Sequence, residues 1–287
     1  MLNRVIQQFK LNVLSINEVE DSHSSTVYKC YLDIGEVVFV KIPYTTLKCQ
    51  RELEAYEILK DRVSIPEMLD YWSGDEECPG AFLLTELKGQ PLTNKDLPTV
   101  AFQVGVLHAS MHQIQPPSIL QLTGIKNEFP DWSNFVERQF YSFAEDVKEV
   151  LDECLYRQAI EKFENMKLQL PPSDGPSFIH MDFRPANIIV DEGKVSGLID
   201  FESVRFGSTE IDFTKLYRDF LSFDFNLYQS YEEGYNTVRP IIDLEVVLPF
   251  YQFTDAFNSI GWCKRRGIEK NASFLKENLS ILKKVLL

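Results

Sequence analysis

Two short polar motifs, and the apolar segment between them, constrain this chain more than any other feature of its sequence. The first motif contains Asp182 and Asn187, and the second contains Asp200, thirteen residues after Asn187. The intervening segment has the pattern of a β-hairpin with a turn at Asp-Glu-Gly-Lys. A hairpin of this length returns the chain to its starting point, so the three oxygen-bearing side chains can converge. Such hard oxygen ligands suit Mg²⁺ shared with phosphates, and a carboxylate that is not a ligand can accept the proton of an attacking hydroxyl.

The rest of the chain predicts a small sheet-rich region followed by a larger helical one. Strand or helix patterns occupy residues 27–32, 37–42, 48–62 and 81–86 in the first region, and residues 97–113, 132–165, 210–238, 241–265 and 271–286 in the second. The fold class is therefore α+β. We expect a β-rich N-terminal lobe over residues 1–86 and a helical C-terminal lobe over residues 87–287.

Composition identifies a globular protein and excludes several classes of partner. The chain has 287 residues, of which 44% are hydrophobic and 25% charged, so it can bury a core without a metal or disulfide. The net charge of −14 repels phosphate backbones and anionic lipids. We therefore expect neither nucleic acid nor a membrane as a partner, whereas a cationic ligand would be concentrated.

The cysteines and the N-terminus give no sign of secretion. The five cysteines are scattered without a Cys-x-x-Cys pair, which supports neither a disulfide framework nor a zinc site. Polar residues interrupt the apolar ones at the N-terminus, and no apolar run reaches about 18 residues. We expect a cytoplasmic protein, and the sequence leaves its oligomeric state open.

The spacing of His180, Asp182 and Asn187, followed by Ile-Asp-Phe at Asp200, resembles the His-Arg-Asp catalytic loop and the metal-binding Asp-Phe-Gly of protein kinases. It is more similar to the aminoglycoside phosphotransferase and choline kinase family, whose loop has the form His-Gly-Asp-x-x-x-x-Asn. The resemblance covers most of the chain and is strongest over residues 178–216. It implies a two-lobed protein-kinase-like fold.

The resemblance also implies a role for each residue of the loop. Asp182 is the catalytic base that receives the substrate hydroxyl, and Asn187 and Asp200 are the Mg²⁺ ligands. His180 fixes the backbone of the loop, and Arg184 falls where protein kinases carry a lysine that reaches the γ-phosphate. The implied cofactors are ATP, or alternatively GTP, and Mg²⁺.

Further correspondences lie in the N-terminal half. Lys41 is in the strand that carries the nucleotide-phosphate lysine of the family, and Glu52 on the next helix is its expected partner, with Glu54 as a rival. The hydroxyl-rich segment at residues 22–26 stands where protein kinases have a glycine-rich loop. The remaining nucleotide-binding candidates are Ser24, Ser25, Thr85, Glu86 and Leu87, and His23 is either a nucleotide contact or a solvated loop residue.

Two residues of the loop depart from the family pattern, since Met181 replaces the usual glycine and Phe183 the usual leucine. A protein kinase is disfavoured, because the short gap between Asp200 and Asp212 leaves no room for an activation segment. In the family, the residue at the position of Asp212 braces the catalytic loop.

Two other clusters have structural interpretations. His108 and His112 are four residues apart among apolar neighbours, and we interpret them as structural rather than as metal ligands. The aromatic run over residues 220–228 is interpreted mainly as core, with a substrate-pocket wall as the alternative.

The acceptor is predicted from charge. Acidic residues outnumber basic ones between residues 215 and 260, and related enzymes use such residues to bind amino groups. Our candidates are Asp219, Glu233 and Asp255, each within two residues of an aromatic residue that could form a pocket wall.

Three functional hypotheses follow. The first is a kinase of a small cationic molecule such as an aminoglycoside, and the second is a metabolic kinase for choline-, amino alcohol- or sugar-type acceptors. The third, a catalytically weak nucleotide-binding regulator, is disfavoured by the intact Asp182, Asn187, Asp200 and Lys41.

Overall fold

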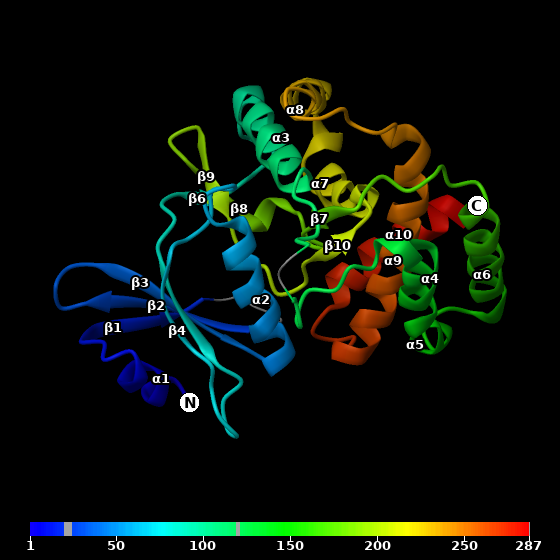
Figure 1. Cartoon of the computed structure of the whole chain (residues 1–287). Helices are drawn as coiled ribbons and strands as arrows, with labels where there is room; N and C mark the ends of the chain where they lie inside the picture. The colour runs from blue at the N-terminus through cyan, green and yellow to red at the C-terminus, as the bar shows by residue number, and fades with distance from the viewer. Residues whose placement is uncertain (20–24, 119–120, 287) are drawn as a thin grey trace.

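The computed structural model describes residues 1–19, 25–118 and 121–286. Figure 1 shows a sheet-containing region beside a larger helical region, which confirms the predicted α+β architecture of a small β-rich N-terminal lobe and a larger helical C-terminal lobe. Within the described residues, no helix has the length and apolar character needed to cross a membrane.

The N-terminal region is built on an antiparallel five-stranded sheet with the strand order β1-β2-β3-β5-β4. Its elements are α1 (Leu2–Gln8), β1 (Val13–Glu18), β2 (Ser25–Leu32), β3 (Val37–Pro43), α2 (Thr46–Leu59), β4 (Met68–Trp72) and β5 (Ala81–Thr85). The strands predicted over residues 27–32, 37–42 and 81–86 correspond to β2, β3 and β5.

Alternation along β3 determines where Lys41 points. Val38 and Val40 are buried in the apolar cluster that includes Val5 of α1. Lys41 therefore projects from the opposite face, where it contacts Glu52 of α2. The helix α2 begins where the Thr45 hydroxyl accepts a hydrogen bond from the amide of Lys48, and it ends at Leu59 rather than at the predicted residue 62.

The edge strands β1 and β4 were not predicted. In both, exposed positions occur in adjacent pairs, so the sequence lacks the strict alternation that marks a half-buried strand. Each lies at an edge of the sheet, where no strand of the described residues pairs with one side of the backbone.

The C-terminal region contains most of the helices and two small sheets. Its helices are α3 (Pro98–His112), α4 (Trp132–Ser142), α5 (Ala144–Lys148), α6 (Glu153–Lys167), α7 (Phe213–Asp219), α8 (Phe225–Asn236), α9 (Leu244–Arg266) and α10 (Ala272–Leu286). The short strands are β6 (Gln90–Pro91), β7 (Ser177–Ile179), β8 (Ile188–Asp191), β9 (Lys194–Leu198) and β10 (Arg205–Gly207). The 3-10 turns are η1 (Phe129–Asp131), η2 (Pro185–Asn187), η3 (Thr209–Asp212) and η4 (Leu221–Phe223).

Two predicted helical stretches are interrupted. Residues 132–165 form the three helices α4, α5 and α6, and residues 210–238 start as η3 and divide into α7 and α8. Phe220 leaves helical geometry after α7, and the Asp224 carboxylate caps α8 through the amide of Asn226. In the aromatic run, Phe220 is buried as predicted, but Phe223 and Phe225 are exposed, so the core interpretation is wrong for those two residues.

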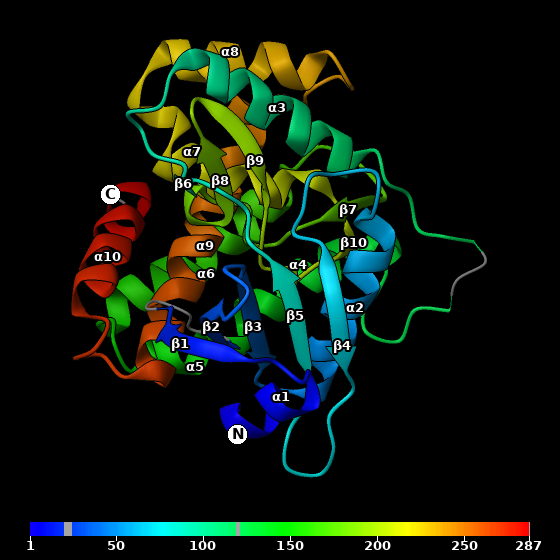
Figure 2. The ribbon, with the colours of Figure 1, turned by 90° about the vertical axis from the view of Figure 1, so that its left-hand side faces the viewer.

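The helices α3 and α8 lie side by side (Figure 2) and pack unusually closely. A Cβ atom added at Gly105 of α3 would lie 2.1 Å from the carbonyl oxygen of Tyr231 in α8. A Cβ atom at Gly234 would lie 2.0 Å from the carbonyl oxygen of Phe102. Glycine at both positions therefore lets the two backbones touch.

Candidate active site

The predicted hairpin returns the chain to the catalytic loop. Strands β8 and β9 pair in antiparallel register, and the amide of Ile199 donates a 3.0 Å hydrogen bond to the carbonyl oxygen of Asn187. His180 Nε2 lies 3.0 Å from the carbonyl oxygen of Ile199. The structure therefore holds the residue before Asp200 against both ends of the loop.

Asp212 also fixes the backbone of the loop through hydrogen bonds. Its carboxylate accepts hydrogen bonds from the amides of His180 at 2.6 Å and Met181 at 2.7 Å. Met181 adopts the left-handed conformation with φ +67°, which favours glycine. This explains physically why a glycine is usual at this position, and the two amide contacts offset the strain that methionine introduces.

Asp182 lies between two cations. Lys215 Nζ is 2.6 Å from Oδ1, and Arg184 Nε is 3.2 Å from Oδ2. Burial alone would raise the pKa of Asp182, but Lys215 and Arg184 outweigh it and lower the pKa below its usual value. The carboxylate is thus ionised at neutral pH, as a proton acceptor must be.

Asn187 and Asp200 offer oxygen atoms suited to Mg²⁺. Asn187 Nδ2 donates to the carbonyl oxygen and to Oδ2 of Asp182, at 2.9 and 3.2 Å, which leaves Asn187 Oδ1 directed elsewhere. Asp200 Oδ1 binds Lys41, and among the described residues no donor occupies Asp200 Oδ2. One amide oxygen and one carboxylate oxygen are hard donors, so these residues fit Mg²⁺.

Lys41 connects the two regions of the chain. Its Nζ lies 2.7 Å from Glu52 Oε1 and 2.7 Å from Asp200 Oδ1. Burial lowers the pKa of Lys41, but Asp200 and Glu52 outweigh this effect and raise it, so the lysine is charged. Burial raises the pKa of Glu52 to about 7, against the opposing effect of Lys41.

Glu54, the rival partner of Lys41, is committed elsewhere. Its carboxylate accepts hydrogen bonds from the amides of Thr123, Gly124 and Ile125, at 2.7 to 3.0 Å. These bonds outweigh partial burial and lower the pKa of Glu54. The structure therefore pairs Lys41 with Glu52 and uses Glu54 to fix a loop.

The remaining predicted nucleotide-binding residues that the structure describes lie at the ends of strands: Ser25 starts β2, Thr85 ends β5, and Glu86 and Leu87 follow β5. Thr85 ends β5 and exchanges hydrogen bonds with Glu67, and the Glu86 carboxylate binds Lys29 at 2.7 Å. Within the described part of the chain, the carbonyl of Glu86 and the amide of Leu87 take part in no backbone hydrogen bond. Ser25 is buried at the start of β2, whereas Ser24 and His23 lie outside the described residues.

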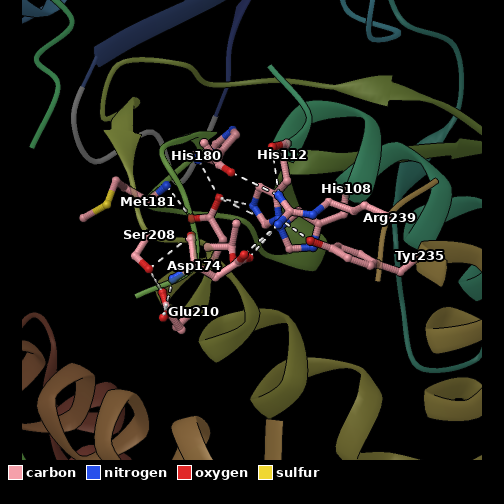
Figure 3. Close-up of polar contacts among 12 residues, drawn as sticks. His108, His112, Asp174, His180, Met181, Ser208, Glu210, Tyr235 and Arg239 are labelled. Carbon is pink, nitrogen blue, oxygen red and sulfur yellow. Dashed lines mark hydrogen bonds and ion pairs between the residues drawn. The ribbon is translucent and has the colours of Figure 1, made fainter. Parts of the chain in front are cut away.

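His108 and His112 form a buried network beneath the loop (Figure 3). His108 Nδ1 lies 2.6 Å from the Tyr231 hydroxyl, and His112 Nδ1 lies 2.8 Å from that of Tyr235. Asp212 Oδ2 faces both rings, 3.4 Å from His112 Nε2 and 3.9 Å from His108 Nε2. Burial lowers the pKa of His108 to about 3, so that imidazole is neutral.

These three residues have the donor types of a metal site, but hydrogen bonds account for most of their polar atoms, with His108 Nε2, 3.9 Å from Asp212 Oδ2, as the exception. Both Asp212 oxygens are bound to loop amides, and each imidazole is held by a tyrosine. The network supports the catalytic loop, in agreement with the structural interpretation of the histidines.

A second network, partly buried and also drawn in Figure 3, fixes the segment before β7. Arg239 Nη2 binds both carboxylate oxygens of Asp174, at 2.9 and 2.7 Å. Glu210 accepts a 3.1 Å hydrogen bond from the amide of Asp174 and another from the Ser208 hydroxyl. Burial raises the pKa of Glu210 to about 7. None of these four residues was a sequence-based site candidate.

The three residues predicted to bind the acceptor molecule, Asp219, Glu233 and Asp255, do not form one unpaired acidic surface. Arg218 binds Asp219 at 2.6 and 2.9 Å and Asp255 at 2.7 Å. Glu233 is an exposed residue of α8 that accepts a hydrogen bond from Gln229. Only Asp219 and Asp255 therefore share a site, and an arginine neutralises part of their charge.

The sequence did not indicate that Lys215 pairs with Asp182 or that Arg218 pairs with Asp219 and Asp255. Both were counted only as the basic minority in an acidic segment. A usable signal was available, because Lys215 is three residues after Asp212 and lies in the first turn of α7. Because α7 starts directly after Asp212, which binds the loop amides, a cation in its first turn lies near the same loop.

The chain matches the model of the phosphotransferase enzyme family over residues 15–249. No curated protein matches it in sequence.

Several solved structures share its fold. The GDP and kanamycin complex of APH(2")-IIia has a TM-score of 0.77 at 14% identity, covering 99% of this chain and 97% of that one. The ternary complex of a thermostable mutant of aminoglycoside phosphotransferase APH(4)-Ia with ADP and hygromycin B has a TM-score of 0.69 at 14% identity, covering 99% and 97%. Macrolide 2'-phosphotransferase MphH from Brachybacterium faecium has a TM-score of 0.69 at 11% identity, covering 99% and 95%. These likenesses confirm the kinase-like fold, and the family match, which extends over most of the chain, shows that this protein belongs to the phosphotransferase enzyme family.

Proposed function

We propose that this protein transfers the γ-phosphoryl group of ATP, with Mg²⁺, to a hydroxyl group of a small molecule. The observation that carries this proposal is the position of Lys41, whose Nζ lies 2.7 Å from both Glu52 and Asp200. This arrangement puts a fixed cation in contact with Asp200, and the preceding residue, Ile199, is hydrogen-bonded to His180 and Asn187 of the loop that contains Asp182.

The nucleotide would lie between two lobes. Residues 1–86 would form the nucleotide-binding lobe, and residues 87–287 would form the lobe that contains the catalytic loop. Lys41, oriented by Glu52, would bind the phosphates. The carbonyl of Glu86 and the amide of Leu87 would bind the nucleotide base, with Thr85 fixing the connector and Ser25, together with Ser24, near the phosphates. Neighbouring structures contain ADP and AMP-PNP as well as GDP, so GTP is the alternative donor.

Asn187 and Asp200 would hold Mg²⁺, which would neutralise charge on the phosphate oxygens and keep the γ-phosphoryl group in line for transfer. Asp182 would orient the acceptor hydroxyl and receive its proton as the new phosphate ester forms. Arg184, which is half-exposed beside Asp182, would neutralise charge on the transferring group. His180 acts through the backbone of Ile199 and is therefore a positioning residue.

The acceptor belongs to one of two classes. A cationic acceptor such as an aminoglycoside is supported by the net charge of −14, and neighbouring structures contain kanamycin and hygromycin B. Asp219 and Asp255 would then bind its amines, with Glu233 further out. The pairing of both aspartates with Arg218 favours the second class, a metabolite, because it leaves less free negative charge for a polyamine.

The test is ATP consumption with Mg²⁺ in the presence of aminoglycosides, other basic antibiotics, choline, amino alcohols and sugars. Transfer to one hydroxyl compound, confirmed by isolation of its phosphate ester, would support the proposal. Asp182→Ala is the matched control and should abolish transfer. A protein that neither binds Mg·ATP nor forms ADP would contradict the proposal and revive the regulator hypothesis.

A further inference from the structure

The cation nearest to the catalytic carboxylate is Lys215, which the family resemblance did not assign. Its Nζ lies 2.6 Å from Asp182 Oδ1, whereas Arg184 and Asn187 lie beside Oδ2. Oδ1 is thus the oxygen that remains for an acceptor hydroxyl, and Lys215 lies next to it. Burial opposes the charge of Lys215, but Asp182 and Asp255 outweigh it and raise the pKa of Lys215.

Lys215 retains hydrogen-bonding capacity. An ammonium group has three donors, and among the described residues only the Asp182 carboxylate accepts one from Lys215. The lysine side chain is 29% exposed, so its charge reaches the space beside the base. If the acceptor hydroxyl binds Asp182 Oδ1, a group attached to the neighbouring carbon of the acceptor can reach the Lys215 ammonium.

The charge around this position is balanced rather than acidic. Asp255, which also faces Lys215, is bound at 2.7 Å by Arg218, and Arg218 is bound in turn by Asp219. Counting Arg184 and Asp182 as well, three cations and three carboxylates form these ion pairs, while Glu277 and Asp200 lie further out and face Arg218 and Arg184. An ammonium substituent beside the reacting hydroxyl would meet Lys215, whose nearest carboxylates are already paired, and like charges at such distances repel.

We propose that the acceptor carries an anionic oxygen group, a carboxylate or a phosphate ester, beside the hydroxyl that is phosphorylated, and that Lys215 binds this group. The inference rests on the proposed phosphotransfer and specifies its substrate class. Lys215 donates to the anionic group with the protons that Asp182 does not use, and the reacting hydroxyl donates to Asp182 Oδ1.

The experiment compares acceptors that carry an anionic group with uncharged counterparts of the same carbon skeleton: glycerate with glycerol, gluconate with sorbitol, and glucose 6-phosphate with glucose. Kanamycin is included as the polyamine. Formation of ADP by the full-length protein with Mg·ATP gives kcat and KM for each. We expect turnover of at least one acid and a lower KM for it than for its uncharged counterpart, and the carboxylate and phosphate arms identify which anion is used.

The variants are Lys215→Met, which removes the charge at similar length, and Lys215→Arg, which keeps it. Lys215→Met should raise KM for the acid about 10- to 100-fold, the range for loss of a hydrogen bond to a charged group, while KM for the uncharged counterpart changes much less; kcat should fall for both, because Lys215 also pairs with Asp182. Lys215→Arg should retain most of the preference. Lys167→Met is the matched control, because Lys167 of α6 makes a 2.9 Å ion pair with Glu137 and is 18% exposed.

A second readout does not depend on finding the acceptor. Malonate, at fixed free Mg²⁺, should inhibit the slow hydrolysis of ATP by the parent protein and should inhibit Lys215→Met more weakly. Three results would each overturn the anionic acceptor while leaving phosphotransfer intact: equal inhibition of both proteins, an equal rise in KM for charged and uncharged acceptors, or turnover of kanamycin with no turnover of any acid. Absence of both ATP hydrolysis and Mg·ATP binding would instead overturn the phosphotransferase proposal, and this inference with it.

Discussion

The ring of Phe183 is stacked on the imidazole of His108, with centroids 3.7 Å apart and ring planes inclined by 6°. Phe183 directly follows Asp182, and His108 belongs to α3, so this contact joins the catalytic loop to the helical core. Burial keeps His108 neutral, and the Tyr231 hydroxyl fixes its ring. The position of Asp182 therefore depends on packing more than seventy residues away in the sequence.

Phe183→Ala should reduce both stability and turnover. Removal of a fully buried phenylalanine costs about 3–5 kcal/mol, and misplacement of a catalytic group by about 1 Å can reduce the rate about 100-fold. Thermal unfolding and kcat, the latter measured below the Tm of the variant, check both effects. Phe183→Leu keeps most of the apolar volume and is the control. Equal kcat for the alanine variant and the parent would show that the stack does not position Asp182.

Alanine variants of Asp182 and Asp200 should differ in whether they lose turnover or Mg·ATP affinity. Asp182→Ala should reduce turnover about 10²–10⁴-fold, the usual contribution of general acid–base catalysis, with nearly unchanged affinity for Mg·ATP. Asp200→Ala should weaken Mg·ATP binding itself, since it removes the proposed metal ligand and a partner of Lys41. Calorimetric titration of Mg·ATP and steady-state kinetics distinguish the two. Loss of Mg·ATP affinity in Asp182→Ala would contradict its assignment as the base.

The sequence was most informative where local patterns determine structure. Alternation predicted β2 and β-branched composition predicted β3, and the pattern between Asn187 and Asp200 predicted the hairpin that follows the loop of Asp182. The pairing of Lys41 with Glu52 was also predicted, although only the structure removes Glu54 as a rival by occupying it with three loop amides.

The remainder depends on packing between distant segments. Lys215 approaches Asp182, and Arg218 approaches Asp255, because α7 lies between the catalytic loop and α9, and no periodic pattern encodes that position. The interpretation of Asp219 and Asp255 as free acceptor-binding groups therefore could not account for Arg218. Edge strands such as β1 also escaped prediction, because their exposure has no regular alternation.

Gly105→Ala should separate α3 from α8. Its Cβ would lie 2.1 Å from the Tyr231 carbonyl oxygen and 2.7 Å from the Tyr235 amide nitrogen, both backbone atoms. Overpacking of this kind costs about 1–3 kcal/mol, and it would loosen the hydrogen bonds between the two histidines, His108 and His112, and the two tyrosine hydroxyls. Thermal unfolding tests the loss, with Ser110→Ala on the same helix as the control. Unchanged Tm would show that the helices can move apart freely.

Glu210→Gln should change how stability depends on pH. Burial raises the pKa of Glu210 in the folded protein to about 7, from an ordinary value of 4.5. Between these two values the folded state holds a proton that the unfolded state has released. The free energy of unfolding contributed by this residue therefore falls as the pH rises through that window, by a few kcal/mol at most, about 1.4 kcal/mol for each unit of pKa shift.

Glutamine cannot ionise, and its oxygen can still accept the hydrogen bond from the Asp174 amide. The variant should therefore be close to the parent in stability near pH 5 and should become progressively more stable than the parent towards pH 8. Urea denaturation at a series of pH values measures this difference, in which the contributions of the other titrating groups largely cancel. Glu161→Gln, at an exposed position of α6, is the control and should remain parallel to the parent. A Glu210→Gln curve that also runs parallel to the parent would mean that Glu210 stays ionised in the folded protein, and that the Ser208 hydroxyl and the Asp174 amide compensate for its burial.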